Sequence, residues 1–309
     1  MLHEGKYRVG LSRWQVAAMA SALALAMSVP TGAETDPLVL APTLFDSRAD
    51  AIRSQIGPAE FIENLLDRPV SVQNILRYEA VIAGFERDEI DLAILGPLPY
   101  VRLSQHHPQV EPLVRFRDTD GRDHYRCTLV AFADDRRPLD QYADARLALT
   151  QPYSTCGYFA AATILEQADI DVATTDFAFI GRHDQIAISV VTGGHDIGII
   201  KDHLADRYAS VGLQPLADTM PLPGFTLVAN TRTLDAATRE KLRRGFLALA
   251  PDHEVLRENW PANMINGTLP ANDADYDAIR RDFERIQFPD GAQAPDTPPP
   301  GETSAEAMR

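Results

Sequence analysis

Hydroxyl, thiol and backbone N–H groups gather in residues 151–158, which read QPYSTCGY. An apolar strand is expected just before this segment, at residues 146–150, and the apolar run that follows is typical of a helix. Ser154, Thr155 and Cys156 would then stand at a helix N-terminus, where the first N–H groups lack partners within the helix and the helix dipole favours negative charge. The segment therefore indicates either an ordinary N-cap, for which Ser and Thr are preferred, or an anion site.

Residues 1–33 have the features of a secretory signal peptide. Three basic residues precede an apolar run at 16–29, and the small residues that follow predict cleavage after Ala33. The run is shorter than the roughly 20 residues of a membrane-spanning helix. We therefore expect a mature protein that is exported to the periplasm and is soluble there.

The overall charge of the chain restricts its partners. It has 29 Lys and Arg against 44 Asp and Glu, a net charge of −15, and loss of three basic and one acidic residue with the signal peptide makes this −17. Such a surface argues against binding to nucleic acid or to an anionic membrane. An anion site would have to be built locally, from dipoles and hydrogen bonds.

From residue 37 onward, short apolar strands alternate with amphipathic helices, which is typical of parallel α/β layers. The order of elements predicts two α/β lobes joined by two crossing strands, near 124–133 and 224–230, with a ligand cleft between the lobes. Lobe 1 would comprise residues 34–133 and 224–288, and lobe 2 would be the insertion 134–223. Residues 289–309 are rich in Pro and acids and predict a disordered tail.

Four segments resemble, in the same order and spacing, a family of substrate-binding proteins. They are residues 91–100 (DLAILGPLPY), 152–158 (PYSTCGY), 181–184 (GRHD) and 272–276 (NDADY). The family is the PhnD-like group that binds phosphonate, phosphite or phosphate for ABC transporters, within the type II periplasmic binding protein fold. The resemblance implies a binding protein and not an enzyme, with no cofactor and no catalytic residues.

The resemblance also implies a set of contacts to an oxyanion. Ser154, Thr155 and the N–H groups that follow would hold the oxyanion, His183 would reach its oxygens from the next helix start, and Tyr100 would close the site from lobe 1. Each aromatic residue has an alternative role in the core, and His183 has one as an ordinary first helix residue. The full set of expected binding residues is Tyr100, Cys127, Ser154, Thr155, Cys156, Gly157, Tyr158, His183 and Lys201.

The segment at 221–225 (PLPGF) departs from the family pattern. Members that bind aminophosphonates carry an acid there that would hold the ligand's ammonium, and this chain has none. Lys201, at the end of the strand 197–200, is cationic. We therefore expect a small phosphorus oxyanion without a positive tail, delivered to an ABC transporter permease.

The two cysteines leave several interpretations open. Cys127 and Cys156 could form a disulfide, because the compartment is oxidising and the count is even, or remain buried thiols. As thiolates they could bind soft trivalent arsenic, and a branch of the family binds arsenite and works with a sensor histidine kinase. A remote alternative is a Cys-dependent enzyme in which Cys156 acts with His183 and Asp184. No metal-ligand spacing is evident, and no metal site is expected.

Overall fold

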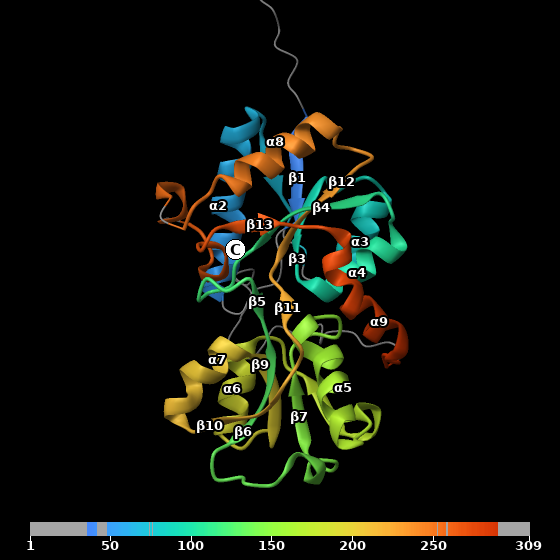
Figure 1. Cartoon of the computed structure of the whole chain (residues 1–309), viewed down its shortest axis with the longest axis vertical. Coiled ribbons are helices and arrows are strands. Elements are labelled where there is room, and N and C mark those ends of the chain that lie inside the picture. Colours follow the sequence, from blue (N-terminus) through green and yellow to red (C-terminus); the bar gives the residue numbers. More distant parts are fainter. Residues whose placement is uncertain are drawn as a thin grey trace, which may run out of the picture. The chain divides into compact units, whose positions relative to one another are not determined.

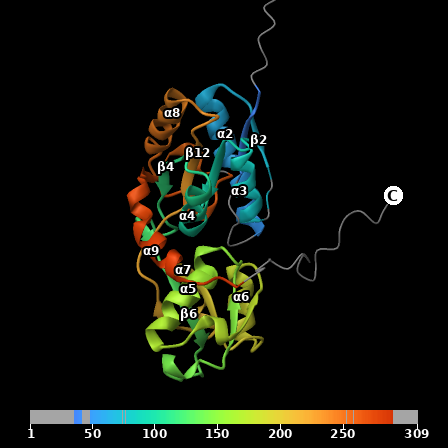
Figure 2. The same ribbon diagram turned by 90° about the vertical axis from the view of Figure 1, so that its right-hand side faces the viewer.

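The computed structural model describes residues 36–41, 48–73, 75, 77–251, 253–257 and 259–289. The predicted signal peptide and residues 290–309 of the predicted tail lie outside these ranges. The described residues from 37 onward form two mixed β-sheets, each covered by helices on both faces (Figures 1 and 2). None of the helices in these ranges is both long enough and apolar enough to span a membrane.

The first sheet has six strands, which lie in the spatial order β13 (Thr268–Pro270), β4 (Val110–Phe116), β12 (Thr226–Asn230), β3 (Leu92–Leu95), β1 (Leu38–Ala41) and β2 (Val70–Val72). β1 runs parallel to β2 and β3, whereas β12 lies antiparallel between β3 and β4. Every residue of β3 and β12 is buried, as expected for central strands with helices on both faces.

Alternation along β3 shows how the helices cover this sheet. Leu92 and Ile94 pack in a core with α2 (Arg48–Leu66) and α8 (Ala236–Leu247). Ala93 and Leu95 point to the opposite face and pack in a core with the other three helices of this lobe, α3 (Tyr78–Glu86), α4 (Pro97–His106) and α9 (Asp277–Arg285). Successive side chains of a strand point to opposite faces, so one short apolar strand anchors both helical layers.

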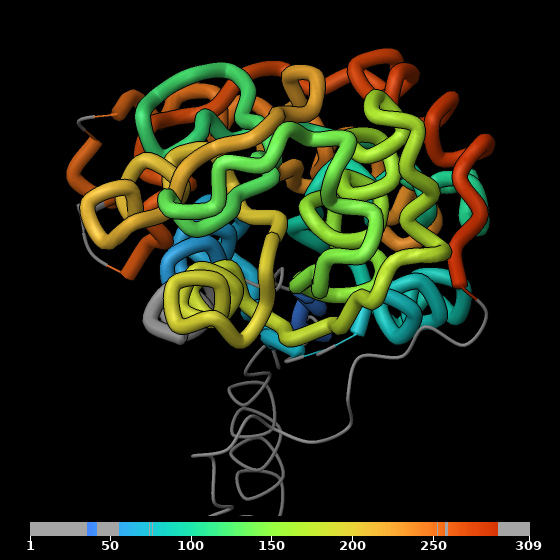
Figure 3. Tube along the Cα trace, turned by 90° about the horizontal axis from the view of Figure 1, so that it is seen from below, coloured from blue at the N-terminus to red at the C-terminus, as the bar shows by residue number. Residues whose placement is uncertain are grey.

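The second sheet has five strands, in the spatial order β10 (Leu213–Asp218), β6 (Cys127–Phe132), β9 (Ile197–Lys201), β7 (Arg146–Leu149) and β8 (Asp176–Phe179). β7 is parallel to β8 and β9, and β6 is antiparallel to its two neighbours. One face packs against α6 (His183–Val191) and α7 (Asp202–Tyr208), and the other against α5 (Ala160–Leu165) (Figure 3).

Two short segments cross between the sheets, β5 (His124–Tyr125) and β11 (Leu222–Pro223), and they pair antiparallel with each other. The sequence predicted crossings near 124–133 and 224–230, and these two segments lie at the start of the first range and just before the second. β6, expected as part of lobe 1, is a central strand of the second sheet, and β12 is a central strand of the first. A central strand is apolar on both faces and its sequence therefore looks the same as that of a buried crossing strand.

Candidate functional site

A small pocket lies where the two sheets meet. Its walls come from the carboxyl ends of β3, β7 and β9, the N-terminus of α6, and the crossing segments. The lining residues are Tyr78, Gly96, Tyr125, Ser154, Thr155, Cys156, His183, Lys201 and Phe225. None of these described residues carries a carboxylate. The pocket therefore suits an anion that has no cationic group.

The turn that follows β7 presents the hydroxyls of Ser154 and Thr155 to this pocket. Residues Thr155–Phe159 form a wide π-type turn with non-helical φ/ψ at Cys156 and Gly157, and regular helix begins only at Ala160. Ser154 occupies the N-cap position, but within the described part of the chain its side chain makes no capping hydrogen bond. Geometry here disfavours the ordinary N-cap that the sequence left open for Ser154.

Gly157 lets this turn close tightly. A Cβ built on Gly157 would lie 2.4 Å from the carbonyl oxygen of Gln151 and 3.2 Å from the hydroxyl of Thr150. That hydroxyl donates to the carbonyl of Cys156 at 3.0 Å, and this hydrogen bond ties the turn to the end of β7. Gly157 does not line the pocket, so its role is to permit a backbone approach that any side chain would block.

Thr155 joins the two lobes directly. α4 begins at Pro97, with a second proline at position 99, so Leu98 supplies the first N–H of this helix. The Leu98 N–H donates to Oγ1 of Thr155 at 3.1 Å. The N-terminus of α4 thus points into the pocket opposite the Ser154–Cys156 turn, and it adds the positive end of a second helix dipole.

Lys201 brings a positive charge to the pocket wall while being almost wholly buried, with 2% of its surface exposed. Its Nζ lies 4.5 Å from the ring centroid of Phe225 and 5.1 Å from that of Tyr125. Aromatic faces attract a cation, and desolvation strengthens this attraction. Lys201 therefore gives the pocket wall a positive charge, which favours an anionic occupant over a cationic one.

His183 is the first residue of α6, is 6% exposed and lines the pocket. The neighbouring Asp184 points elsewhere: its Oδ1 accepts from Arg182 Nε at 3.1 Å and from the Gln185 N–H at 2.9 Å. The relay of Cys156, His183 and Asp184 expected for a Cys-dependent enzyme is therefore not assembled. His183 instead lines the pocket from the start of a helix.

Cys127 and Cys156 form a disulfide, with Cα atoms 5.2 Å apart, within the ordinary range for such bonds. This resolves the three interpretations that the sequence left open for the cysteines. The described residues contain no free thiol, so neither sulfur is a thiolate ligand or nucleophile in this form. The bond links the first residue of β6 to the pocket turn, and of the two cysteines only Cys156 lines the pocket.

Two tyrosines expected at the site belong to the core instead. Tyr100 is 1% exposed, donates from its hydroxyl to Asp273 at 2.7 Å and packs on the ring of Tyr276, and burial together with Asp273 raises its pKa. Tyr158 is also 1% exposed and packs on Phe177. Neither residue lines the pocket. Tyr100 lies in α4 and Tyr158 in the turn after β7, and an aromatic residue close in sequence to a binding segment gives no signal for whether it faces the pocket or the core.

Four lining residues were not among the expected binding residues: Tyr78, Gly96, Tyr125 and Phe225. Gly96 stands at the carboxyl end of β3, a position that does carry a signal, since ligands gather at such ends in α/β folds. A Cβ there would lie 3.3 Å from Oγ1 of Thr155. The three aromatic residues come from elements that meet only through the fold.

Comparison with known proteins agrees with this geometry. Residues 46–276 match the family described as ABC transporter, phosphonate, periplasmic substrate-binding protein. The phosphate-import protein PhnD of Mycolicibacterium smegmatis is 23% identical over 303 residues, which cover 86% of this chain and 94% of that protein.

Solved structures show the same fold. PhnD1 from Prochlorococcus marinus, in complex with methylphosphonate, matches with a TM-score of 0.69 at 17% identity over 80% of this chain and 97% of that one. A binding protein component of an ABC phosphonate transporter from Pseudomonas aeruginosa matches with a TM-score of 0.67 at 16% identity, over 80% of this chain and 85% of that one. With two α/β lobes and a pocket between them, the chain belongs to the phosphonate-binding family of periplasmic substrate-binding proteins of ABC transporters.

Proposed function

We propose that this protein captures a small phosphorus oxyanion in the pocket between its lobes and presents it, in the periplasm, to an ABC transporter permease. The observation that carries this proposal is the buried Lys201 beside the hydroxyls of Ser154 and Thr155, in a pocket whose described lining has no carboxylate. Charge-assisted hydrogen bonds of this kind suit the oxygens of phosphate, phosphite or an alkylphosphonate. The names of the relatives, phosphate import and a methylphosphonate complex, support the same ligand class.

Binding would couple to closure of the lobes. The ligand would contact the Ser154–Cys156 turn from one lobe and the N-terminus of α4 from the other, so it would favour the arrangement in which both are near. The crossing segments β5 and β11 are short, and in the described chain they pair with each other and belong to neither large sheet, which makes them the expected hinge. A permease, and not a sensor kinase, is the expected partner because the matched family serves ABC transporters.

The disulfide bears on the choice between phosphorus and arsenic. Trivalent arsenic is bound in proteins through sulfur, and soft thiolates are the groups that select soft ions. Both sulfurs of this chain are bonded to each other, which favours a hard oxyanion of phosphorus. The missing acid at residues 221–225 further favours a ligand without an ammonium group.

Calorimetry with phosphate, phosphite, methylphosphonate, 2-aminoethylphosphonate and arsenite tests the proposal. We expect at least one of the first three to bind, and the last two to bind much more weakly or not at all. Replacing Lys201 with Met should weaken binding roughly ten- to a hundredfold, the equivalent of one charged hydrogen bond of about 1.5–3 kcal/mol. Lys241→Met is the matched control, because Lys241 is exposed on α8 and its loss changes the net charge equally.

Three results would contradict the proposal. The first is no binding of any phosphorus oxyanion by protein freed of bound ligand. The second is tight binding of arsenite by the oxidised protein. The third is equal loss of affinity in the Lys201→Met and Lys241→Met variants, because the effect would then come from net charge and not from the pocket.

A further inference from the structure

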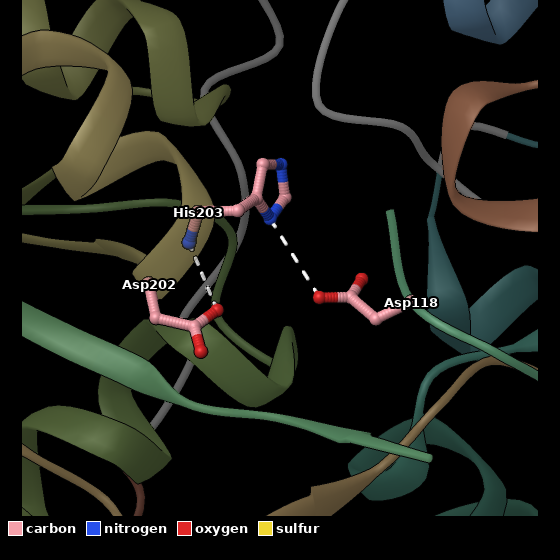
Figure 4. Close-up of side chains that lie close together, drawn as sticks. All are labelled: Asp118, Asp202 and His203. Atoms are coloured by element: carbon pink, nitrogen blue, oxygen red, sulfur yellow. Dashed lines mark hydrogen bonds and ion pairs between the residues drawn. The ribbon is translucent and has the colours of Figure 1, made fainter. Parts of the chain in front are cut away.

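Asp118, Asp202 and His203 come together beside the crossing segments, outside the anion pocket (Figure 4). Asp118 lies in the turn between β4 and β5, whereas Asp202 and His203 are the first two residues of α7, after β9. Each of the three side chains offers one donor atom, and these atoms all lie within 4.8 Å of one another. The cluster therefore joins a segment that follows the first sheet to one that follows the second.

The carboxylate of Asp118 is the observation that points to a ligand. Asp118 is 3% exposed, and its buried Oδ2 accepts no hydrogen bond from any described residue. Nδ1 of His203 lies 3.8 Å from this oxygen, beyond hydrogen-bond distance. A buried carboxylate oxygen that lacks a donor is costly, and a bound cation is one way in which proteins satisfy it. Oδ2 points toward His203, into the middle of the cluster.

We infer that Asp118, Asp202 and His203 form a binding site for a divalent transition-metal ion such as Zn²⁺. One imidazole and two carboxylates suit such an ion, whereas Mg²⁺ and Ca²⁺ prefer oxygen ligands alone. Ligands bind Zn²⁺ at about 2.0–2.2 Å, which places neighbouring ligand atoms about 3.4 Å apart in a tetrahedron. Small side-chain rotations would bring the three donors to that spacing, and water would complete the coordination.

The backbone around Asp118 holds this ligand in place before any ion binds. The Asp118 N–H donates to the Arg122 carbonyl at 3.0 Å, and the Asp118 carbonyl accepts from Gly121 N–H at 2.8 Å and from Asn266 Nδ2 at 2.8 Å. Asp202 is fixed at the other side, because its Oδ1 accepts from the His203 N–H at 2.9 Å. Ligands that are positioned by such outer contacts lose little freedom when they bind a metal.

Arg122 would compete with a bound metal ion for the carboxylate of Asp202. Its Nη2 donates to Oδ2 of Asp202 at 2.8 Å, so a guanidinium already neutralises part of the charge of that carboxylate. A metal would have to share Asp202 with Arg122 or displace it. Replacing Arg122 with Gln should therefore tighten metal binding, which is not expected if Zn²⁺ binds elsewhere on the surface.

Competition with a chromophoric chelator, on the untagged full chain stripped of metal, tests the inference at neutral pH. We expect one equivalent of Zn²⁺ per chain, and no comparable uptake of Mg²⁺ or Ca²⁺. Affinity should fall at least tenfold in Asp118→Asn and in His203→Gln. His124→Gln is the matched control, since His124 also lies 2.7 Å from a carboxylate, that of Asp123, but on the exposed surface.

The inference is wrong if the chain takes up no stoichiometric Zn²⁺, or if uptake is the same in wild type and in His203→Gln. It is also wrong if His124→Gln weakens binding as much as His203→Gln. Circular dichroism shows whether Asp118→Asn folds, and if it does not, the partly exposed His203 still provides the decisive variant. Phosphate binding is measured separately on the same variants, so the proposed metal site and the proposed oxyanion function can be refuted independently of each other.

Discussion

Opening the disulfide between Cys127 and Cys156 should lower the stability of the protein measurably. The bond joins residues 29 apart in sequence, from the first residue of β6 to the pocket turn. Its main effect is to restrict the unfolded chain, which regains the freedom of that loop when the bond opens. The side chains themselves are small and buried, so their replacement by Ala removes little packing.

The size of the effect follows from the length of the loop. In the chain-entropy model a closed loop of about 30 residues contributes about 3.6 kcal/mol at 25 °C. A folded chain of about 250 residues has an unfolding entropy of about 0.5 kcal/mol per kelvin at its midpoint. Dividing the first number by the second gives an expected fall in Tm of about 7 °C.

Thermal unfolding of the wild type with and without a reductant, followed by circular dichroism, measures this fall. Thiol alkylation before each scan verifies that the bond is open. The Cys127→Ala/Cys156→Ala double variant should unfold near the reduced wild type, and the reductant should leave it unchanged. An unaltered Tm in fully reduced protein would refute the argument, because the disulfide would then not lower the conformational entropy of the unfolded chain.

Two further predictions concern the pocket turn and the acid stability of the first lobe. Gly157→Ala should weaken or abolish oxyanion binding in calorimetry, because its Cβ would meet the Gln151 carbonyl at 2.4 Å; unchanged affinity would contradict the role given to this glycine. Burial raises the pKa of Glu111, but hydrogen bonds from Arg243 and Arg239 outweigh it and hold this pKa below its usual value. Its stabilisation, about 1 kcal/mol, is thus present above the unfolded-state pKa near 4.3 and is lost as pH falls through the lower folded pKa. In the Glu111→Gln variant, Tm should depend less on pH between about 3 and 6 than it does in the wild type. The same dependence of Tm on pH in both proteins would contradict this.

Local patterns in the sequence predicted much of the fold and part of the site. A buried apolar run and an N-terminal proline are local signals, and they mark the strand at 92–95 and the helix that begins at Pro97. The hydroxyl turn after β7 was placed correctly for the same reason. The start of regular helix only at Ala160 depends on the kink at Gly157 and on the Thr150 side chain, and the sequence has no signal for either.

Features that depend on distant segments could not be predicted in this way. Tyr100 is held in the core by Asp273, more than 170 residues away in sequence. The cluster of Asp118, Asp202 and His203 has no ligand spacing, because its members follow strands of two different sheets. The disulfide was one of three open alternatives, and only the distance between β6 and the pocket turn decided among them.

The two prolines at the start of α4 give the protein a built-in spectroscopic reporter. Pro97 and Pro99 have no amide proton, and the Tyr100 N–H is already bonded to the Gly96 carbonyl at 3.1 Å. Leu98 therefore contributes the single amide resonance of this helix end that responds to what lies across the pocket. Its chemical shift and its hydrogen-exchange rate should report separation of the lobes, since both depend on whether Thr155 or solvent accepts its proton. One resolved cross-peak would thus follow opening and closing of the cleft without any added label on a side chain.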